Sequence, residues 1–356
     1  MAEGTKSRWP DLPTDILASI IKLLEVRIDI IRIGSVCRSW RNSIFYSRED
    51  QIVFPLKTPL HNIYLSQTFS LPKNTFLQFY PTSMYLIKPI YDDSRTAFLV
   101  KVEHHYSGRH KARLLDLFSQ ENDIYGNEVI DSRNYHVSEL CKMCTWKSSS
   151  ERGSFYLNST DHKIFKKVIL YPDDVWTTRE NCVVFAIDSR RKLEYWKFGD
   201  EKWTTICNAK FGDMILYNGK VCATEYTIGH IWVIEISSNQ VIKIALHEDF
   251  SRYNCAFLKS CGDLYLVGLG HSIAGIAKYP VYKLNIETPC RNWVRVACIG
   301  GGDRIFVLAS QHTSSFSVST NEFVRSEGNK IYKECFPKYY TYIECPWTHE
   351  QRNLQA

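Results

Sequence analysis

The stretch WPDLPTDILASIIKLLEVRIDIIRIGSVCRSWR, residues 9–41, has the clearest helical pattern in this chain of 356 residues. The hydrophobic residues of its first part recur at steps of one, three and four, which places them along one side of a helix. These residues are Ile16, Leu17, Ile20, Leu23 and Leu24. Pro13 suits the first turn of this helix, because the N–H that proline lacks would have no partner there.

Two further short helices are predicted after this one. Asp29 can cap the second helix, and Ser39 can cap the third. The second would carry Ile30, Ile33, Val36 and Cys37, and the third would carry Trp40, Ile44 and Phe45. Because short helices are marginal alone and can bury only a small shared core, we expect this bundle to lean on another surface.

This helical pattern resembles the F-box, by which substrate receptors of SCF-type ubiquitin ligases bind their Skp-type adaptor. The half-motifs DLPTDIL and SVCRSWR occur in order, near the N-terminus and at the family's spacing. The matching residues are Leu12, Pro13, Asp15, Ile16, Leu17, Ile20, Leu24, Asp29, Arg32, Ser35, Val36, Cys37, Trp40 and Arg41. The resemblance implies adaptor binding through Leu12, Pro13, Ile16, Leu17, Ile20, Leu24, Val36, Cys37 and Trp40.

Two alternatives remain open from the residues alone. The helices could form the cap of a larger domain, with their hydrophobic stripe buried internally. Trp40 could contact a partner, as aromatic anchors often do, or it could fill the interior of the three helices.

Composition indicates a folded chain without a strong preference for anionic partners. Hydrophobic residues make up 44% and aromatic residues 13% of the chain, whereas disordered chains are poor in both. The net charge is +6, and its densest clusters are RHKAR at 109–113 and SRRK at 189–192. A short charge run is usually a solvated turn, so nucleic-acid binding is not expected.

The cysteines do not indicate disulfides or a metal site. The N-terminus lacks the apolar core of a signal peptide, so we expect a reducing compartment, the cytoplasm or nucleus or both, and free thiols. Cys141 and Cys144 form the one CxxC pair, but no second pair is evident and zinc needs about four ligands. No apolar run is long enough for a membrane-spanning helix.

The rest of the chain has the pattern of short antiparallel strands. Residues 51–89 indicate an extended connection with short strands, and 138–146 is the one later stretch that could be helical. Beyond residue 89, runs rich in Val, Ile, Tyr, Phe and Thr are separated by Gly, Asn and Asp. The predicted strands begin at Thr96, Cys182, Leu193, Met214, Lys220, Ile231, Asp263, Pro280, Arg304 and Ser315.

A weak internal repeat favours a β-propeller. Trp203 precedes Asp213 by ten positions, and Trp293 precedes Asp303 by the same distance. The two tryptophans are 90 residues apart, which is twice a propeller-blade period of about 45 residues. The Asn218-Gly219 turn has an echo at Gly262. A pair of β-sandwiches is the alternative that the spacing leaves open.

A second resemblance covers most of residues 58–336. The segments CVVFAIDSRRKLEYWKFGDEKWTTI, FGDMILYNGKVCATEYTIGHIWVIEI, CGDLYLVGLG, VYKLNIE, SFSVST and GNKIYKECF, in this order, are similar to plant F-box proteins with a C-terminal KIB-type β-propeller. The resemblance implies a propeller that presents loops to a target protein.

No catalytic constellation is present. The chain has no GxSxG elbow, HExxH helix or P-loop lysine, and the glycines at 268–275 have the wrong spacing for a dinucleotide site. Asp188, Asp200 and Asp213 are predicted at turns. Cys37 lies on an apolar stripe, which favours a buried small side chain over a nucleophile.

These observations predict a multidomain α and β protein. Residues 1–50 would form a three-helix F-box, 51–89 a connection, 90–340 a mostly antiparallel all-β domain, and 341–356 a tail. The expected function is substrate recognition in an SCF-type ubiquitin ligase, with the adaptor linking to cullin and RING subunits. No catalytic residue, cofactor or metal is expected, and the target is not predicted. The alternatives are a propeller that binds a ligand or protein without promoting degradation, and a propeller hydrolase.

Overall fold

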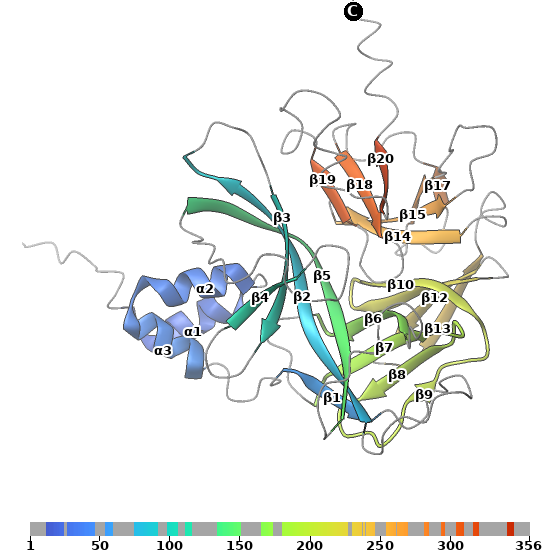
Figure 1. Cartoon of the computed structure of the whole chain (residues 1–356), viewed down its shortest axis with the longest axis horizontal. Coiled ribbons are helices and arrows are strands. Elements are labelled where there is room, and N and C mark those ends of the chain that lie inside the picture. The colour runs from blue at the N-terminus through green and yellow to red at the C-terminus, as the bar shows by residue number, and fades with distance from the viewer. Residues whose placement is uncertain are drawn as a thin grey trace, which may run out of the picture.

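The structure is a computed structural model that describes the three helices, the strands and some of their turns. The described residues are 12–24, 27–46, 54–59, 75–91, 98–105, 111–115, 134–150, 165–173, 180–226, 230–236, 238, 240–245, 254–260, 262–269, 281–284, 293–295, 304–309, 316–319 and 340–344. The helices are α1 (Thr14–Lys22), α2 (Arg27–Val36) and α3 (Arg38–Tyr46). In Figure 1 they lie at the left, with the first sheet between them and the other sheets.

The described strands form five antiparallel sheets, which we number along the chain. The first sheet contains β1 (Leu56–Pro59), β2 (Thr75–Pro89), β3 (Phe98–His105), β4 (Lys111–Leu115) and β5 (Tyr135–Ser150). The second contains β6 (Phe165–Tyr171), β7 (Val183–Asp188), β8 (Leu193–Lys197) and β9 (Thr204–Thr205). The third contains β10 (Phe211–Tyr217), β11 (Lys220–Glu225), β12 (His230–Glu235) and β13 (Gln240–Ala245).

The remaining two sheets complete the β domain. The fourth contains β14 (Asn254–Ser260), β15 (Asp263–Leu269), β16 (Val281–Leu284) and β17 (Trp293–Arg295), and the fifth contains β18 (Arg304–Ala309), β19 (Phe316–Ser319) and β20 (Tyr340–Glu344). The second, third and fourth sheets are simple meanders in which each strand pairs with the next. All ten predicted strands are confirmed within these sheets.

The sheets are arranged in a closed ring. One edge strand of each sheet contacts the corresponding strands of the two neighbouring sheets. Strand β5 lies against β6, β6 against β10, β10 against β14, and β14 against β19. Strand β19 in turn lies against β5, which closes the circuit. This radial arrangement is that of a β-propeller, and it confirms the predicted fold.

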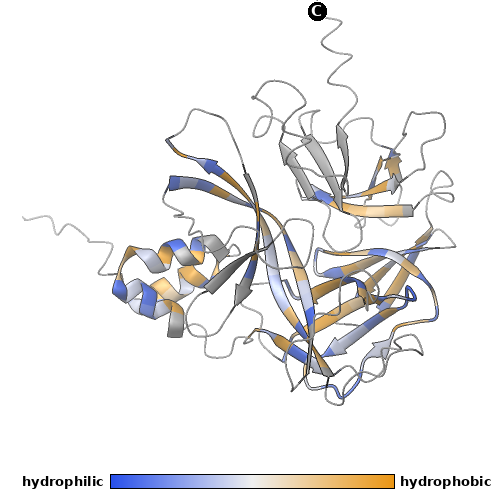
Figure 2. Cartoon of the chain, viewed as in Figure 1, coloured by the Kyte–Doolittle hydropathy of each residue, from blue (hydrophilic) through white to orange (hydrophobic). Residues whose placement is uncertain are grey.

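Neighbouring sheets pack face to face through alternate side chains of their strands. In β7, Val184 packs in a core shared with Phe79 of the first sheet, whereas Phe185 packs in a core shared with Phe211 of the third. Because the side-chain period of a strand is two, one strand thus supplies two hydrophobic cores. Figure 2 shows the result, with hydrophobic residues prominent in the second and third sheets.

The tryptophan of the sequence repeat joins the first two sheets. The ring of Trp203 is buried, with its centroid 5.3 Å from that of Phe165 and 6.1 Å from that of Phe79. Its Nε1 donates a hydrogen bond of 3.1 Å to the carbonyl oxygen of Pro59. Trp203 therefore marks a contact between the first and second sheets.

The predicted echo of the Asn218-Gly219 turn is also confirmed. Asn218 and Gly219 both have positive φ, at 47° and 70°, as a tight two-residue hairpin between β10 and β11 requires. Gly262, with φ of 80°, lies in the corresponding turn between β14 and β15. The Tyr217 hydroxyl donates to the Gly262 carbonyl oxygen at 3.0 Å, so the two turns are joined directly.

One expectation for the first sheet differs from the structure. The helix considered for residues 138–146 is wrong, because β5 is a strand that pairs with β2 along its length, from Tyr135 opposite Pro89 to Ser150 opposite Thr75. The segment 51–89, expected as an extended connection with short strands, supplies the strands β1 and β2, and β2 pairs with three other strands.

Asp213 was predicted in a turn, and this is wrong, because it lies within β10. Its Oδ1 accepts a 2.5 Å ionic hydrogen bond from Lys167 Nζ of β6. Its Oδ2 accepts the backbone N–H of Phe257 of β14 at 2.7 Å. One buried carboxylate therefore connects the inner strands of three sheets. Asp188 and Asp200 do stabilise turns, because they accept the backbone N–H groups of Lys192 and Lys197.

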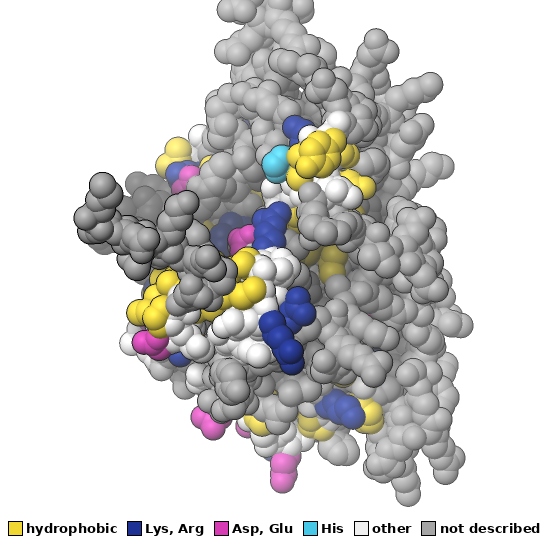
Figure 3. Space-filling model, turned by 90° about the vertical axis from the view of Figure 1, so that its left-hand side faces the viewer, with side chains coloured by type: hydrophobic (Ala, Val, Ile, Leu, Met, Phe, Trp, Pro, Cys, Tyr) yellow, Lys and Arg dark blue, Asp and Glu magenta, His cyan; other side chains and the backbone are white. Residues whose placement is uncertain are grey.

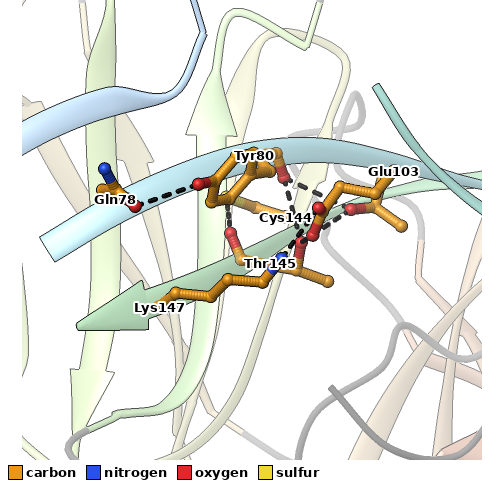
Figure 4. A network of polar contacts seen from close by, with 7 residues as sticks. Gln78, Tyr80, Glu103, Cys144, Thr145 and Lys147 are labelled. Carbon is orange, nitrogen blue, oxygen red and sulfur yellow. Dashed lines mark hydrogen bonds and ion pairs between the residues drawn. The ribbon is translucent and has the colours of Figure 1, made fainter. Parts of the chain in front are cut away.

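A buried polar network stabilises the first sheet across three strands (Figure 4). Glu103 of β3 is fully buried and accepts hydrogen bonds from Lys147 Nζ at 2.8 Å and from Thr145 Oγ1 at 3.0 Å, both on β5. Strand β2 lies between β3 and β5, and the Oγ1 atom of its Thr82 is 2.9 Å from the Oγ1 atom of Thr145. A buried carboxylate needs such partners, and here they fix the relative positions of β2, β3 and β5.

The Asp213 contacts lead to a prediction about stability. Asp213→Asn should lower the free energy of unfolding by about 3 kcal/mol, because Lys167 would keep a buried charge without its ionic partner. The matched control is Asp263→Asn, because Asp263 pairs with Lys283 at 2.6 Å but both side chains are well exposed, at 36% and 42%. The control should cost at most about 1 kcal/mol. Urea unfolding followed by tryptophan fluorescence measures both, and equal losses would contradict the assigned role.

Candidate adaptor-binding surface

Helix α1 carries two parallel hydrophobic stripes. Residues Leu17 and Ile21 are almost fully buried and continue to the half-buried Leu24, at steps of four and three. Ile16 and Ile20, one position earlier, lead to Leu23, and these side chains are 47%, 39% and 81% exposed. A helix turns by about 100° per residue, so the second stripe lies beside the first on the outer side.

The inner stripe belongs to the core of the three helices. This core consists of Leu17, Ile21, Ile30 and Ile44, with Leu12, Leu24, Ile33 and Trp40 packed against it. Four fully buried side chains form a small core, consistent with the expectation that the helices need further support. Sequence reasoning omitted Ile21, which the i, i+4, i+7 spacing from Leu17 to Leu24 could have identified.

Helices α2 and α3 approach closely at Gly34. A Cβ atom at this position would lie 2.9 Å from Ile44 Cδ1, closer than ordinary packing allows. The Arg41 Nε donates to the Gly34 carbonyl oxygen at 3.0 Å, which ties the two helices together at the same place. A larger residue at this position would therefore require the end of the Ile44 side chain to move.

The helix starts differ in detail from the predicted caps. Ser39 does not cap the third helix, because α3 begins at Arg38 and Cys37 occupies the cap position, with Sγ 3.5 Å from the Trp40 backbone nitrogen. Asp29 does not cap α2, which begins at Arg27, and its carboxylate instead accepts a 3.0 Å hydrogen bond from Arg32. Pro13 lies at the N-cap position of α1, and its carbonyl accepts the Leu17 N–H at 3.0 Å.

The predicted contact residues divide into two groups. Leu12, Leu17, Leu24 and Trp40 pack within the helices, whereas Pro13, Ile16, Ile20 and Val36 are exposed, and Cys37 is half-buried. Hydrophobic side chains accordingly gather on the helical side of the molecule in Figure 3. On α1, Pro13, Ile16 and Ile20 are extended by Leu23, and these four residues form an apolar surface that we call the α1 face.

Trp40 is mainly an interior residue. Its ring packs against the core of the helices, and its Nε1 is buried without an acceptor among the described residues. An unpaired buried N–H is costly, so the ring position is set by packing. Of the two roles left open by the sequence, this geometry favours the interior one.

Burial determines the state of several described cysteines. Burial raises the pKa of Cys141, Cys182, Cys222 and Cys255 to about 12, which keeps these thiols protonated. Cys141 and Cys144 lie three residues apart on β5, so they point to opposite faces of the strand. Within the described ranges, no three His, Cys, Asp or Glu side chains are grouped so as to hold a metal ion.

The comparisons with known proteins agree with this architecture. Residues 58–334 match the KIB1-4 beta-propeller family, which is more than half of the chain, and residues 9–48 match the F-box-like family. The chain belongs to the KIB1-4 beta-propeller family. The combination of an F-box-like domain with this propeller confirms the resemblance seen in the sequence.

The chain is similar to F-box proteins of Arabidopsis thaliana over most of its length. F-box protein At2g17036 is 25% identical over 378 residues, covering 97% of this chain and 87% of its own length. F-box protein At2g26160 is 24% identical over 348 residues, covering 92% and 95%. F-box protein SKIP23 is 29% identical over 287 residues, covering 76% and 66%. In the part of the chain that the structure describes, no helix is long and apolar enough to span a membrane.

The contact at Gly34 leads to a prediction about the helical domain. Gly34→Ala places a methyl group 2.9 Å from Ile44 Cδ1, so the end of the Ile44 side chain must move, and this cost should largely cancel the gain of about 1 kcal/mol in helix propensity that Ala has over Gly. Ile44→Val removes that atom at a cost of about 1 kcal/mol by itself. The double variant should therefore be more stable than the sum of the two single effects predicts. Thermal unfolding of the four proteins measures this coupling, and simple additivity would contradict the contact.

Proposed function

We propose that this chain is a substrate receptor of an SCF-type ubiquitin ligase, in which the α1 face binds a Skp-type adaptor. The observation that carries the proposal is the exposed stripe of Ile16, Ile20 and Leu23 beside a fully packed core. Exposed apolar side chains grouped on one helix typically mark a protein-binding site. The F-box-like match over residues 9–48 and the F-box relatives support this assignment.

The division of the nine predicted contact residues refines the proposal. Pro13, Ile16, Ile20 and Val36 would contact the adaptor directly, with Leu23 as an additional contact. Leu12, Leu17, Leu24 and Trp40 would hold the helices in the binding arrangement, and Cys37 would cap α3. A domain that gains partner contacts through the α1 face also gains the support that its small core requires.

The propeller would hold the target protein, and the adaptor would link it to cullin and RING subunits. Holding a target lysine near the carrier protein that bears activated ubiquitin raises the effective concentration of the reactants. Proximity alone would therefore promote the transfer, and this chain would supply no reactive side chain and no cofactor. Members of the F-box family typically act as non-catalytic subunits of this kind. The proposed location is the cytoplasm, the nucleus or both.

Adaptor binding tests this proposal directly. Ile16→Asp with Ile20→Asp should weaken binding of a purified Skp-type adaptor by more than about tenfold, because each exposed anchor contributes about 1 kcal/mol or more. Val241→Asp on β13 is the matched control, because Val241 is similarly exposed, at 41%, but lies in the propeller. Isothermal titration calorimetry measures both affinities, and circular dichroism checks the fold.

Two outcomes would contradict the proposal. The folded wild-type chain could fail to bind the adaptor at micromolar concentration. Alternatively, the Ile16→Asp/Ile20→Asp variant could bind as well as the wild type and the Val241→Asp control do. If binding is confirmed, affinity capture from cells with the proteasome blocked should retain target proteins with the Ile16→Asp/Ile20→Asp variant and lose the ligase subunits.

A further inference from the structure

The outer edge of the third sheet is an exposed strand. The inner strand β10 contacts the neighbouring sheets, and β13 lies at the opposite edge, where it pairs with β12 alone among the described strands. This pairing is continuous, from Gln240 opposite Glu235 to Ala245 opposite His230. In the part of the chain that the structure describes, the backbone of residues 240–244 makes no hydrogen bond outside this pairing. Alternate N–H and C=O groups of an edge strand point away from its sheet, so this edge offers a row of unused backbone groups.

The outer edges of the other two simple meanders are much shorter. The outer strands of the second and fourth sheets are β9 and β17, with two and three residues, whereas β13 has six. Short strands, prolines, bulges and charges usually protect an edge from further pairing. Strand β13 has no proline, its register has no bulge, and its one charged side chain is Lys243. Its branched residues Val241, Ile242 and Ile244 favour an extended backbone.

The side chains of β13 divide between the two faces of the sheet. Ile242 and Ile244 pack in the core shared with the fourth sheet. Val241 and Lys243 lie on the other face, on which Lys243 is directly opposite Trp232 of β12. Val241 is 41% exposed, and Lys243 is exposed with its Nζ 4.2 Å from the centroid of the Trp232 ring. An apolar and a cationic side chain therefore lie two positions apart on one exposed face of the edge.

We propose that β13 binds an extended segment of the protein that the propeller recognises, and that this segment adds to the third sheet as a further strand. The backbone of β13 supplies main-chain hydrogen bonds, and side chains on its exposed face select the sequence. Directly opposite side chains contact each other across a strand pair, so the segment carries an apolar residue opposite Val241 and Asp or Glu opposite Lys243. The inference rests on the proposed function, because it names the chemistry of the target.

Charge favours an acidic target segment over a second copy of this chain. Among the described residues, Lys243 contacts the Trp232 ring and pairs with no carboxylate. Two copies paired at this edge would each bring Lys243 and a net charge of +6. Like charges directly opposite each other destabilise a strand pair, whereas an acidic side chain opposite Lys243 stabilises it.

Fluorescence anisotropy with the full chain tests the strand addition. The probe is a fluorescein-labelled peptide of sequence Thr-Val-Thr-Glu-Thr-Val-Thr, in which a Val lies two positions from Glu on either side, so that it fits either strand direction. Two further probes have the same side chains but carry N-methyl groups on alternate backbone nitrogens, either those of Val and Glu or those of the inner Thr residues. Because only one alternate set of N–H groups points at β13, one methylated probe should bind more than about tenfold more weakly, and the other should bind as the parent does.

A charge exchange tests the selection by side chains. Lys243→Glu should weaken binding of the Glu probe by about fivefold, and should tighten binding of a probe with Lys in place of Glu by a similar factor. The matched control is Lys259→Glu, because Lys259 is also exposed on a strand, β14 of the fourth sheet. This variant has the same net charge and should keep the wild-type preference for the Glu probe. Circular dichroism checks that both variants are folded.

The proposal would be overturned if the folded wild-type chain did not bind the Glu probe, if both methylated probes bound equally, or if the two variants changed binding equally. Sedimentation velocity examines the other occupant. Dimerisation of the wild type that the Glu probe inhibits would also overturn the proposal, because a second copy of the chain would then occupy the edge.

The adaptor measurement separates this inference from the proposed function. A wild-type chain that binds the Glu probe but not the Skp-type adaptor would contradict the proposed function. A chain that binds the adaptor but not the Glu probe would contradict only the strand addition at β13.

Discussion

The Asp213 carboxylate holds the centre of the propeller together. It binds Lys167 of β6 and the backbone of Phe257 of β14 from its own position on β10, so it connects three sheets that also share hydrophobic cores. Hydrophobic packing is not directional, whereas these two contacts fix the relative positions of the inner strands. The closed circuit of β5, β6, β10, β14 and β19 depends on such positioning, because each sheet must pack against two neighbours at once.

The helical domain has only a small hydrophobic core of its own. Its core contains four buried side chains, and four more hydrophobic residues are packed against them. Ile16, Ile20 and Leu23 remain exposed along one side of α1. The same sequence stripe therefore stabilises the helices with one half and leaves the other half available for a partner. This explains why hydrophobic periodicity identified the helix but could not separate core from contact residues.

Much of the fold follows from local sequence pattern, and the exceptions have identifiable physical causes. Strands such as Val183–Asp188 were predictable, because buried β-branched and aromatic residues dominate them. Strand β5 was missed because the SELCKMCTW stretch of Tyr135–Ser150 lacks this composition, and only its pairing with β2 makes it a strand. The role of Asp213 was missed for a similar reason, since its partners are 46 and 44 residues away in the sequence.

The SRRK run shows what a local charge pattern can and cannot predict. In the sequence, a solvated turn is the simplest interpretation of these cations. In the fold, the buried Asp188 carboxylate accepts the Lys192 N–H and closes this turn. The Arg191 carbonyl oxygen accepts the Phe211 N–H, and the Arg191 guanidinium lies 3.5 Å from the centroid of the Tyr226 ring, so the turn is tied to the third sheet. The local sequence therefore identified the turn, whereas its attachment to the next sheet depends on residues far along the chain.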